Sequence, residues 1–299
     1  MLKKFMLLLI TALPFILFAA CSARTTQPEL SDLDIQVRPE TEELNPNELL
    51  SVHFIDVGEG DAILIVQGSN AMLVDGGPVE TGAYVFNYLR SHGIENLEYV
   101  VATHPFADHV GGLPYVLRRV NVSNVLLPMI YHDTPAYNAF LFAVEDSGAN
   151  VAVPFAGHTF TLGDANITVL APNPTDRWEN RANYSIVLRV EFGTTGFLLM
   201  GDAMREVETN LLDSRLNLSA DVLKIARHGA SSATTSGFLD AVNPSIAVIS
   251  AGGGNSFLSQ EVLRRLTNMG IHILRTDLHG DIIITSNGTT LGVVVERQP

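Results

Sequence analysis

The stretch Thr103-His104-Pro105-Phe106-Ala107-Asp108-His109-Val110-Gly111-Gly112 places two imidazoles and one carboxylate within six residues. It directly follows an apolar, β-branched run at 97–102, which predicts a buried strand that ends at this cluster. Histidine and aspartate are ligands of first-row metals, so three of them in one short loop can converge on a single ion. The alternative interpretation is a loop with surface histidines.

Two later strands end in the same kinds of residue. The apolar run at 196–200 leads into Gly201-Asp202, and the run at 221–226 leads into Arg227-His228. Because α/β folds build their sites at strand ends, we expect Asp202 and His228 to lie near the first cluster. The sequence therefore predicts a site assembled from three strand ends.

Apolar strands and amphipathic helical segments alternate from about residue 50 to the end of the chain. Two strands flank Gly58-Glu59-Gly60-Asp61, which predicts a hairpin, and a third strand runs into Asp75. Helices are expected at 81–92, 136–146, 205–212, 234–242 and 260–269. No repeat and no second linker divides this part of the sequence, so residues 49–299 are predicted to form one α/β domain.

The first 20 residues read as a targeting segment. Lys3 and Lys4 precede an apolar stretch at 5–18 and a small-residue pair before Cys21, the single cysteine of the chain. The pattern is similar to a bacterial lipoprotein signal, in which Cys21 is lipidated; the alternative is an ordinary secretory signal. We therefore expect a signal at 1–20, a polar tether at 21–48, and an extracytoplasmic protein of the bacterial cell envelope that contacts the membrane only through its lipid, or a secreted one.

Charge and cysteine usage limit the function. The chain has 18 basic and 32 acidic residues, a net charge of −14, and loss of Lys3 and Lys4 with the signal brings this to −16. Such a chain is not expected to bind polyanions through its overall field, so a local basic patch or a metal must do so. Without cysteine after residue 21, the domain has no disulfide and no thiolate ligand.

Six motifs, in this order, resemble the metallo-β-lactamase superfamily and, more narrowly, the soluble domain of ComEC-type DNA-uptake proteins. They are Phe54-Ile-Asp-Val-Gly-Glu-Gly-Asp-Ala, Leu73-Val-Asp-Gly-Gly, the 103–113 stretch, Asn183-Tyr-Ser-Ile-Val-Leu, Phe197-Leu-Leu-Met-Gly-Asp and Leu223-Lys-Ile-Ala-Arg-His-Gly-Ala. The resemblance implies a four-layer αββα sandwich, with two sheets packed face to face and a metal site along one edge.

The resemblance also implies a ligand set. His104 falls on the first ligand of one metal, Asp108 and His109 on the pair for a second, Asp202 on the carboxylate that bridges both, and His228 on a further histidine of the second site. A metal held in this way acidifies a water into a nucleophile. Asp108 and Asp202 are thus implied to be catalytic, and zinc or manganese is the expected divalent ion.

Three departures weaken the first metal site. Phe106 stands where the family has its second histidine, Arg227 replaces the first residue of the usual His-His-Gly, and 255–259 lacks a histidine often found there. The first site keeps His104 and Asp202. The second keeps a complete set of four, so we expect one bound ion, with a second in doubt.

Other polar residues are assigned supporting parts. Asp75 is expected to orient a metal ligand from its strand end, and Asp61 to line the site or to fix the hairpin. Asn183 and Ser185 are candidates to polarise a phosphoryl oxygen, although Asn183 also suits a turn. Arg227 is a candidate phosphate clamp, because a guanidinium matches phosphate geometry.

The sequence favours a metal-dependent hydrolase that cleaves a phosphoester, with nucleic acid or a nucleotide as the favoured substrate class. The alternative is a lipid-anchored binding or accessory protein, for example in DNA uptake, that has the fold but has lost catalysis. Nothing in the sequence predicts an oligomeric state.

Overall fold

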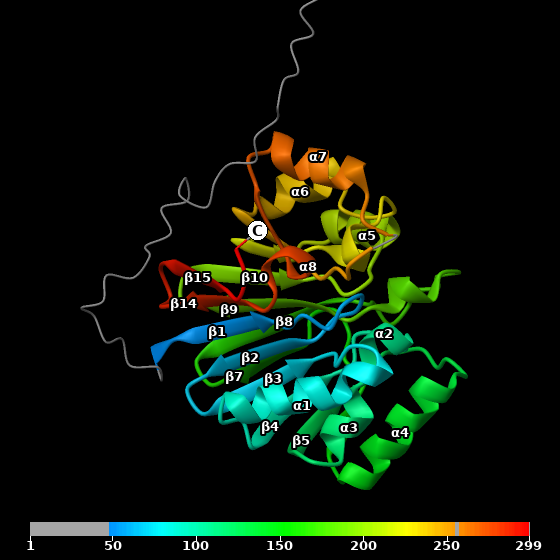
Figure 1. The fold of residues 1–299 in the computed structure, drawn as a ribbon. Coiled ribbons are helices and arrows are strands. Elements are labelled where there is room, and N and C mark those ends of the chain that lie inside the picture. The colour runs from blue at the N-terminus through cyan, green and yellow to red at the C-terminus, as the bar shows by residue number, and fades with distance from the viewer. Residues whose placement is uncertain (1–47, 255–256, 299) are drawn as a thin grey trace, which may run out of the picture.

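The computed structural model describes residues 48–254 and 257–298. The predicted signal segment, Cys21 and the tether up to residue 47 lie outside the described residues. Within the described part, two β-sheets pack face to face and helices cover both outer faces (Figure 1). No helix in these ranges is long and apolar enough to span a membrane.

The first sheet is mixed, with an antiparallel half and a parallel half joined at β3. Its strands, in spatial order, are β15 (Leu291–Val295), β14 (Ile282–Ser286), β1 (Leu50–Phe54), β2 (Ile63–Gln67), β3 (Asn70–Val74), β4 (Asn96–Val101), β5 (Asn121–Leu126) and β6 (Asn150–Ala152).

The second sheet is also mixed, and its parallel half begins at β10. Its strands, in spatial order, are β13 (His272–Arg275), β12 (Ile246–Ile249), β11 (Val222–Lys224), β10 (Thr195–Leu199), β9 (Val187–Phe192), β8 (Ala165–Ala171) and β7 (Thr159–Leu162).

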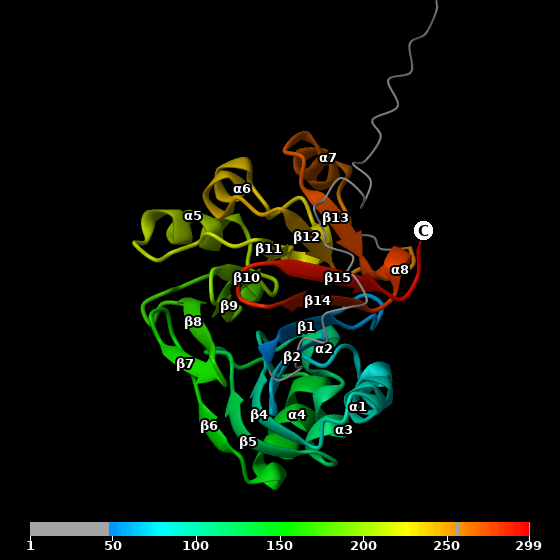
Figure 2. The same ribbon diagram turned by 90° about the vertical axis from the view of Figure 1, so that its left-hand side faces the viewer.

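The helices form the two outer layers, which Figure 2 shows at opposite ends of the view with the sheets between them. The first sheet is covered by α1 (Gly82–Ser91), α3 (Leu113–Leu117) and α4 (Pro135–Ser147), and the second by α5 (Arg205–Asp213), α6 (Ser236–Val242) and α7 (Gln260–Asn268). Two single-turn helices, α2 (Ala107–Val110) and α8 (Thr276–His279), lie at loops. The expected αββα sandwich is confirmed.

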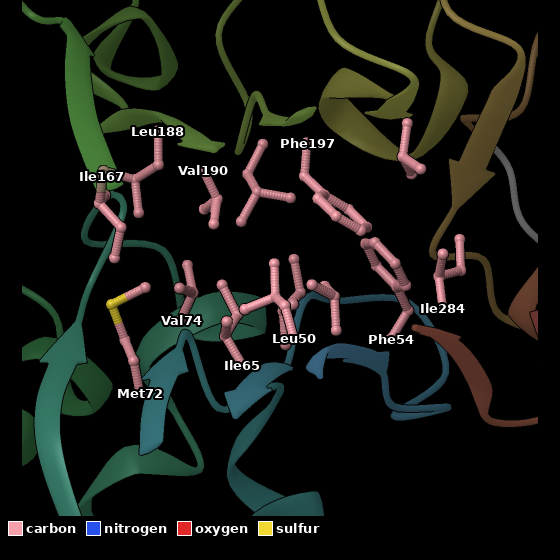
Figure 3. Close-up of a cluster of buried hydrophobic side chains, with 14 of the residues drawn as sticks. Leu50, Phe54, Ile65, Met72, Val74, Ile167, Leu188, Val190, Phe197 and Ile284 are labelled. Carbon is pink, nitrogen blue, oxygen red and sulfur yellow. The ribbon is translucent and has the colours of Figure 1, made fainter. Parts of the chain in front are cut away.

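Alternation along the strands builds this arrangement. On β1, Leu50, Val52 and Phe54 point into a fully buried cluster between the sheets. Figure 3 shows Phe54 of the first sheet and Phe197 of the second with their rings facing across the gap. Because successive side chains of a strand point to opposite faces, the intervening residues face the helical layers. The core thus fixes which face of each sheet is packed against the other sheet.

The predicted elements agree with the structure except at a few boundaries. The motif that begins at Asn183 enters its strand only at Val187, because residues 181–184 form a 3₁₀ turn. The strand expected at 221–226 ends at Lys224, where the chain turns toward the site. The single-turn helix α8 was not predicted, since four residues are too few to show a helical period.

His53 is a buried histidine outside the site. His53 of β1 points toward α1, where its Nδ1 lies 2.9 Å from the Tyr88 hydroxyl and its Nε2 lies 3.0 Å from Ser51 Oγ. Burial, and to a lesser extent the charge of His92, lowers the pKa of His53 from 6.5 to about 3. The folded chain therefore keeps this imidazole neutral at pH values where the unfolded chain protonates it.

The free energy of unfolding should fall as the pH drops from about 6.5 toward 3. In that window His53 is protonated in the unfolded chain but stays neutral in the folded one. The free energy of unfolding therefore falls by up to about 1.4 kcal/mol per pH unit. Urea unfolding over this range should show a shallower pH slope for His53→Gln than for wild type. His158→Gln, at an exposed histidine, should keep the wild-type slope. Equal slopes for all three proteins would contradict the assignment.

Candidate metal centre

Polar residues gather where parallel strands of both sheets end. Asp75 follows β3, His104 comes shortly after β4, Asp202 comes shortly after β10, and His228 lies in the turn after β11. A hydrogen bond from the Ile186 N–H to the Thr103 carbonyl, 2.8 Å long, ties the β4 loop to the second sheet. The three strand ends predicted from the sequence, those of β4, β10 and β11, therefore meet at one edge of the sandwich. The end of β3, with Asp75, lies at the same edge.

Close backbone packing holds the loop that carries Asp108 and His109. The Gly76 N–H donates to the His109 carbonyl at 2.7 Å, and the Asp61 N–H donates to the Asp108 carbonyl at 3.2 Å. A Cβ at Gly60 would collide with the Asp108 carbonyl oxygen, and one at Gly112 would collide with the Gly76 carbonyl oxygen. Glycine is required at both positions because two backbones approach each other there.

The donor atoms of the predicted ligands approach one another in overlapping groups, which include His104–His109–Asp202 and Asp108–His109–His228. His109 Nε2 lies 3.5 Å from Asp202 Oδ1 and 3.8 Å from Asp108 Oδ2, while His228 Nε2 lies 3.5 Å from Asp108 Oδ2 and 3.9 Å from Asp202 Oδ1. Bonds of about 2.1 Å to a tetrahedral ion imply donor separations of about 3.4 Å. The spacing is therefore close to that of a four-ligand metal site.

The contacts of the other ring nitrogens show which imidazole atoms can bind a cation. His109 Nδ1 faces Asp75 Oδ2 at 2.8 Å, and His228 Nδ1 faces the Ser250 carbonyl at 3.1 Å. Both partners are acceptors, so Nδ1 carries the proton in each ring and, in the neutral form, Nε2 keeps a lone pair. Lone pairs and carboxylate oxygens then face one another, an arrangement that a cation relieves.

His104 shows the same pattern. The Thr103 hydroxyl donates to Asp75 at 2.6 Å and accepts from His104 Nδ1 at 3.1 Å, so His104 Nε2 turns its lone pair toward Asp202 Oδ2, 3.5 Å away. Within residues 48–254 and 257–298, His104 Nε2, His109 Nε2 and Asp202 Oδ1 are buried without a hydrogen-bond partner. Buried polar atoms of this kind call for an ion or a water.

The pKa values point in the same direction. Burial alone would raise the pKa of Asp202, but the imidazoles of His104 and His109 outweigh it and hold this pKa well below the usual range. Burial would likewise raise the pKa of Asp108, yet His228 and His109 lower it to about 2. Burial would lower the pKa of His109, but Asp75 and Asp202 raise it well above 6.5. The cluster therefore favours positive charge.

Phe106 stands at the position where the family has its second histidine ligand, and it lies beside His104. Its ring packs edge-on against His104, with ring centroids 4.9 Å apart, and its other neighbour is the His132 ring at 5.6 Å. A phenyl ring offers no donor atom. The side of Asp202 that faces His104 is thus left with two of the predicted first-site ligands, His104 Nε2 and Asp202 Oδ2.

Lys224 is a site residue that the sequence interpretation left without a role. Its side chain is fully buried, and its Nζ donates to Asp61 Oδ2 at 2.7 Å and to the Ile225 carbonyl at 3.0 Å. Asp61 Oδ1 lies 3.8 Å from His228 Nδ1. Burial would raise the pKa of Asp61, but Lys224 and the nearby imidazoles lower it. The available signal was a lone cation inside an apolar strand.

The predicted substrate-binding residues lie at the edge of the cluster with protein partners. Asn183 accepts from the Met204 N–H at 2.9 Å and donates to Glu206 at 3.1 Å. Ser185 Oγ accepts from the Asp202 N–H at 3.1 Å. These contacts hold the Asp202 turn, and contact of either residue with substrate stays a prediction.

Arg227 and His228 adopt an uncommon backbone conformation. Their φ angles are 47° and 53°, in the left-handed region that favours glycine. The Arg227 N–H donates to the Gly201 carbonyl at 3.1 Å, and the Arg227 guanidinium carbon lies 5.8 Å from the Phe257 ring centroid. Two consecutive left-handed residues turn the His228 imidazole into the cluster and cost conformational free energy, as is common at functional sites.

The sequence matches a known protein family and several curated proteins. The family model described as "Metallo-beta-lactamase superfamily" matches residues 55–253. ComE operon protein 3 of Bacillus subtilis is 29% identical over 251 residues, which cover 77% of this chain and 32% of that protein. Competence protein ComA of Neisseria gonorrhoeae is 28% identical over 252 residues, covering 82% and 33%. The chain spans about a third of the length of these curated relatives.

Solved structures show the same fold at low sequence identity. The metallo-beta-lactamase fold protein YhfI from Bacillus subtilis matches with a TM-score of 0.53 and 14% identity over 80% of this chain and 99% of that one. CmlA, a diiron beta-hydroxylase from Streptomyces venezuelae, matches with a TM-score of 0.53 and 15% identity over 78% and 53%. With the family model covering most of the described domain, the chain belongs to the metallo-beta-lactamase superfamily, a superfamily of metal-dependent hydrolases.

Proposed function

We propose that this protein is a metal-dependent phosphoester hydrolase. The observation that carries the proposal is the set of four donor atoms from Asp108, His109, Asp202 and His228, spaced 3.5–3.9 Å apart over the contacts given above. Imidazole and carboxylate donors without thiolate suit zinc or manganese. A divalent ion held there would acidify a water and polarise a phosphoryl oxygen.

The residues around the ion have separate tasks in this proposal. Asp108 is the most accessible of the four ligands, with its side chain 35% exposed against 4% for Asp202. It is therefore placed to hold a proton of the attacking water. Asp202 is held in the cluster by its backbone, because its N–H donates to the Ser185 hydroxyl. Arg227 lies beside His228 and offers a guanidinium to a phosphate group.

We propose one ion rather than two. A second ion beside His104 would find His104 Nε2 and Asp202 Oδ2, while Phe106 fills the neighbouring position with carbon. The same substitution is the specific observation that favours the alternative function, a binding or accessory protein without catalysis. Metal content separates the two.

The substrate class and the location rest on other support. The resemblance to DNA-uptake proteins, and a relative named as a competence protein, support nucleic acid or a nucleotide as the substrate. The net charge of −14 argues against long duplex DNA, whose binding depends on many cationic contacts. We further propose that lipidated Cys21 anchors the protein outside the cytoplasm.

Elemental analysis of the purified protein should find close to one zinc or manganese ion per chain. Asp202→Asn should lower the content well below one, because it weakens the carboxylate that faces both His109 and His104. Asp213→Asn, at an exposed residue of α5, should retain the ion. A chain that takes up no metal even after incubation with zinc or manganese would support the binding-protein alternative instead.

The loaded protein should hydrolyse a generic phosphodiester such as bis(p-nitrophenyl) phosphate. Loss of the metal-activated water should reduce kcat by about 100-fold or more in Asp202→Asn and His109→Ala, since each removes a ligand. The measurement is the rate of p-nitrophenol release, with Asp213→Asn as control. Unchanged rates in both ligand variants would show that the activity does not come from this site.

Lys224 and Asp61 should behave as a positioning pair. Lys224→Met leaves the buried Asp61 carboxylate without its cation, which should lower the free energy of unfolding by about 3–5 kcal/mol. The double variant Lys224→Met/Asp61→Asn removes both charges and should recover much of this loss in urea unfolding of the metal-free protein.

Metal affinity should separate positioning from simple stability. Both variants should bind zinc about 10–100-fold more weakly, because Asp61 is the carboxylate beside His228 Nδ1 and outer contacts of this kind tune ligand histidines. If the double variant regained stability and bound zinc as tightly as wild type, the pair would be structural only.

A further inference from the structure

We propose that Arg297 is a positioning residue for the metal centre, because its guanidinium joins the two segments that hold Asp108 and His228 in place. One segment is the loop between β1 and β2, residues 55–62, and the other follows β12, residues 250–252. The inference rests on the proposed metal centre. It adds to that centre a residue that none of the six sequence motifs contains.

Arg297 lies just after β15, and both its backbone and its side chain are held. Its N–H donates to the His279 carbonyl at 2.8 Å. Its Nη2 donates to Asp56 Oδ2 at 2.6 Å and to the Thr276 carbonyl at 3.2 Å. A guanidinium Nη carries two hydrogens, so one nitrogen can make both contacts. Figure 2 shows the segment after β15 running beside α8 and the loop that follows β1.

The β1–β2 loop connects Arg297 to Asp108. Asp56 lies at the start of this loop, and its Oδ1 accepts the Gly58 N–H at 3.3 Å. At the other end of the loop, the Asp61 N–H donates to the Asp108 carbonyl at 3.2 Å. The loop that Arg297 contacts through Asp56 therefore also contacts the backbone of a predicted ligand.

The segment after β12 connects Arg297 to His228. The Thr276 hydroxyl accepts the Ala251 N–H at 2.9 Å and donates to the Ala251 carbonyl at 3.1 Å. Thr276 is fully buried, and its own carbonyl accepts from Arg297. The neighbouring Ser250 carbonyl faces His228 Nδ1 at 3.1 Å. The ring orientation that turns His228 Nε2 toward the cluster therefore depends on a segment that Thr276 holds.

The two segments also pack directly on each other. A Cβ at Gly252 would lie 2.7 Å from the Glu59 backbone nitrogen, so glycine is needed where they meet. Arg297 joins the same segments at a more accessible point, since its side chain is 51% exposed. A shift of one segment against the other would change the separation of Asp108 Oδ2 and His228 Nε2, which are 3.5 Å apart.

Metal affinity should respond to Arg297 more strongly than stability does. Exposed ion pairs contribute little to the free energy of unfolding. Ligand spacing, in contrast, must match the bond lengths of the ion closely. Contacts made directly to a ligand change metal affinity by about 10–100-fold. Arg297 acts one step further away, so we expect a smaller effect.

The experiment measures zinc affinity by competition with a chromophoric chelator. The proteins are wild type, Arg297→Gln, Arg297→Lys, Asp56→Asn and the double variant Arg297→Gln/Asp56→Asn. Arg90→Gln is the matched control, because Arg90 pairs with Glu95 at 3.2 Å on the surface and its side chain is 52% exposed. Urea unfolding and amide hydrogen exchange of the two segments are measured on the same proteins without metal.

Arg297→Gln and Asp56→Asn should each raise the Kd for zinc about three- to tenfold, with nearly unchanged urea midpoints. The double variant should bind zinc no more weakly than the single variants, because both substitutions remove the same contact. Arg297→Lys should recover part of the affinity, since it keeps the charge. Amides of both segments should exchange faster in Arg297→Gln. Arg90→Gln should match wild type in every measurement.

Failure of this inference can be told apart from failure of the proposed function. Wild-type zinc affinity in Arg297→Gln would overturn the assignment even if the two segments exchanged faster, since the contact would then be structural only. An equal loss of affinity in Arg90→Gln would overturn it as well. Wild type that bound zinc but cleaved no phosphodiester would refute the hydrolase and leave the role of Arg297 intact. Wild type that bound no zinc would refute both.

Discussion

The convergence of buried carboxylates is the constraint on which the rest of this structure depends. Asp61, Asp75 and Asp202 are nearly or fully buried at one edge of the sandwich, and Asp108 joins them with its side chain partly exposed. Burying charge without compensation is prohibitive, so each carboxylate needs a cation or several donors. Lys224 neutralises Asp61 and Thr103 donates twice to Asp75. Asp108 and Asp202 are left facing imidazoles, and a divalent ion among them would complete the balance.

Backbone geometry holds these charges at fixed positions. The carboxyl ends of parallel strands from both sheets deliver the side chains, while paired glycines let the β3 and β4 loops touch. The left-handed backbone of Arg227 and His228 completes the ring of ligands at a cost that the surrounding contacts must offset. The core between the sheets contributes by keeping the two edges in register, which places a residue of β11 against one from the β1–β2 loop.

Much of the fold could be predicted from the sequence, because it follows from local patterns, and the residues that the resemblance implies as ligands lie close together in the structure. Short β-branched runs ending in His or Asp identify strand ends, and the motif order identifies the family. The role of Lys224 could not be predicted, because its partner Asp61 lies 163 residues away in the sequence and belongs to the other sheet. The same holds for Asn183 and Ser185, whose contacts with the Asp202 turn depend on a 3₁₀ turn that no period reveals. Local sequence predicts which groups are present, while cross-sheet packing decides their partners.

Phe106 limits the metal chemistry that the site can support. A histidine at that position would add a donor beside His104 and favour a second ion, which would bring two further positive charges against the phosphate. Phenylalanine offers no donor atom there, and the net charge of −14 makes electrostatic capture of a polyanion by the chain as a whole weak. The substitution that weakens the first metal site therefore leaves Asp108, His109, Asp202 and His228 as the residues on which the proposed metal chemistry depends.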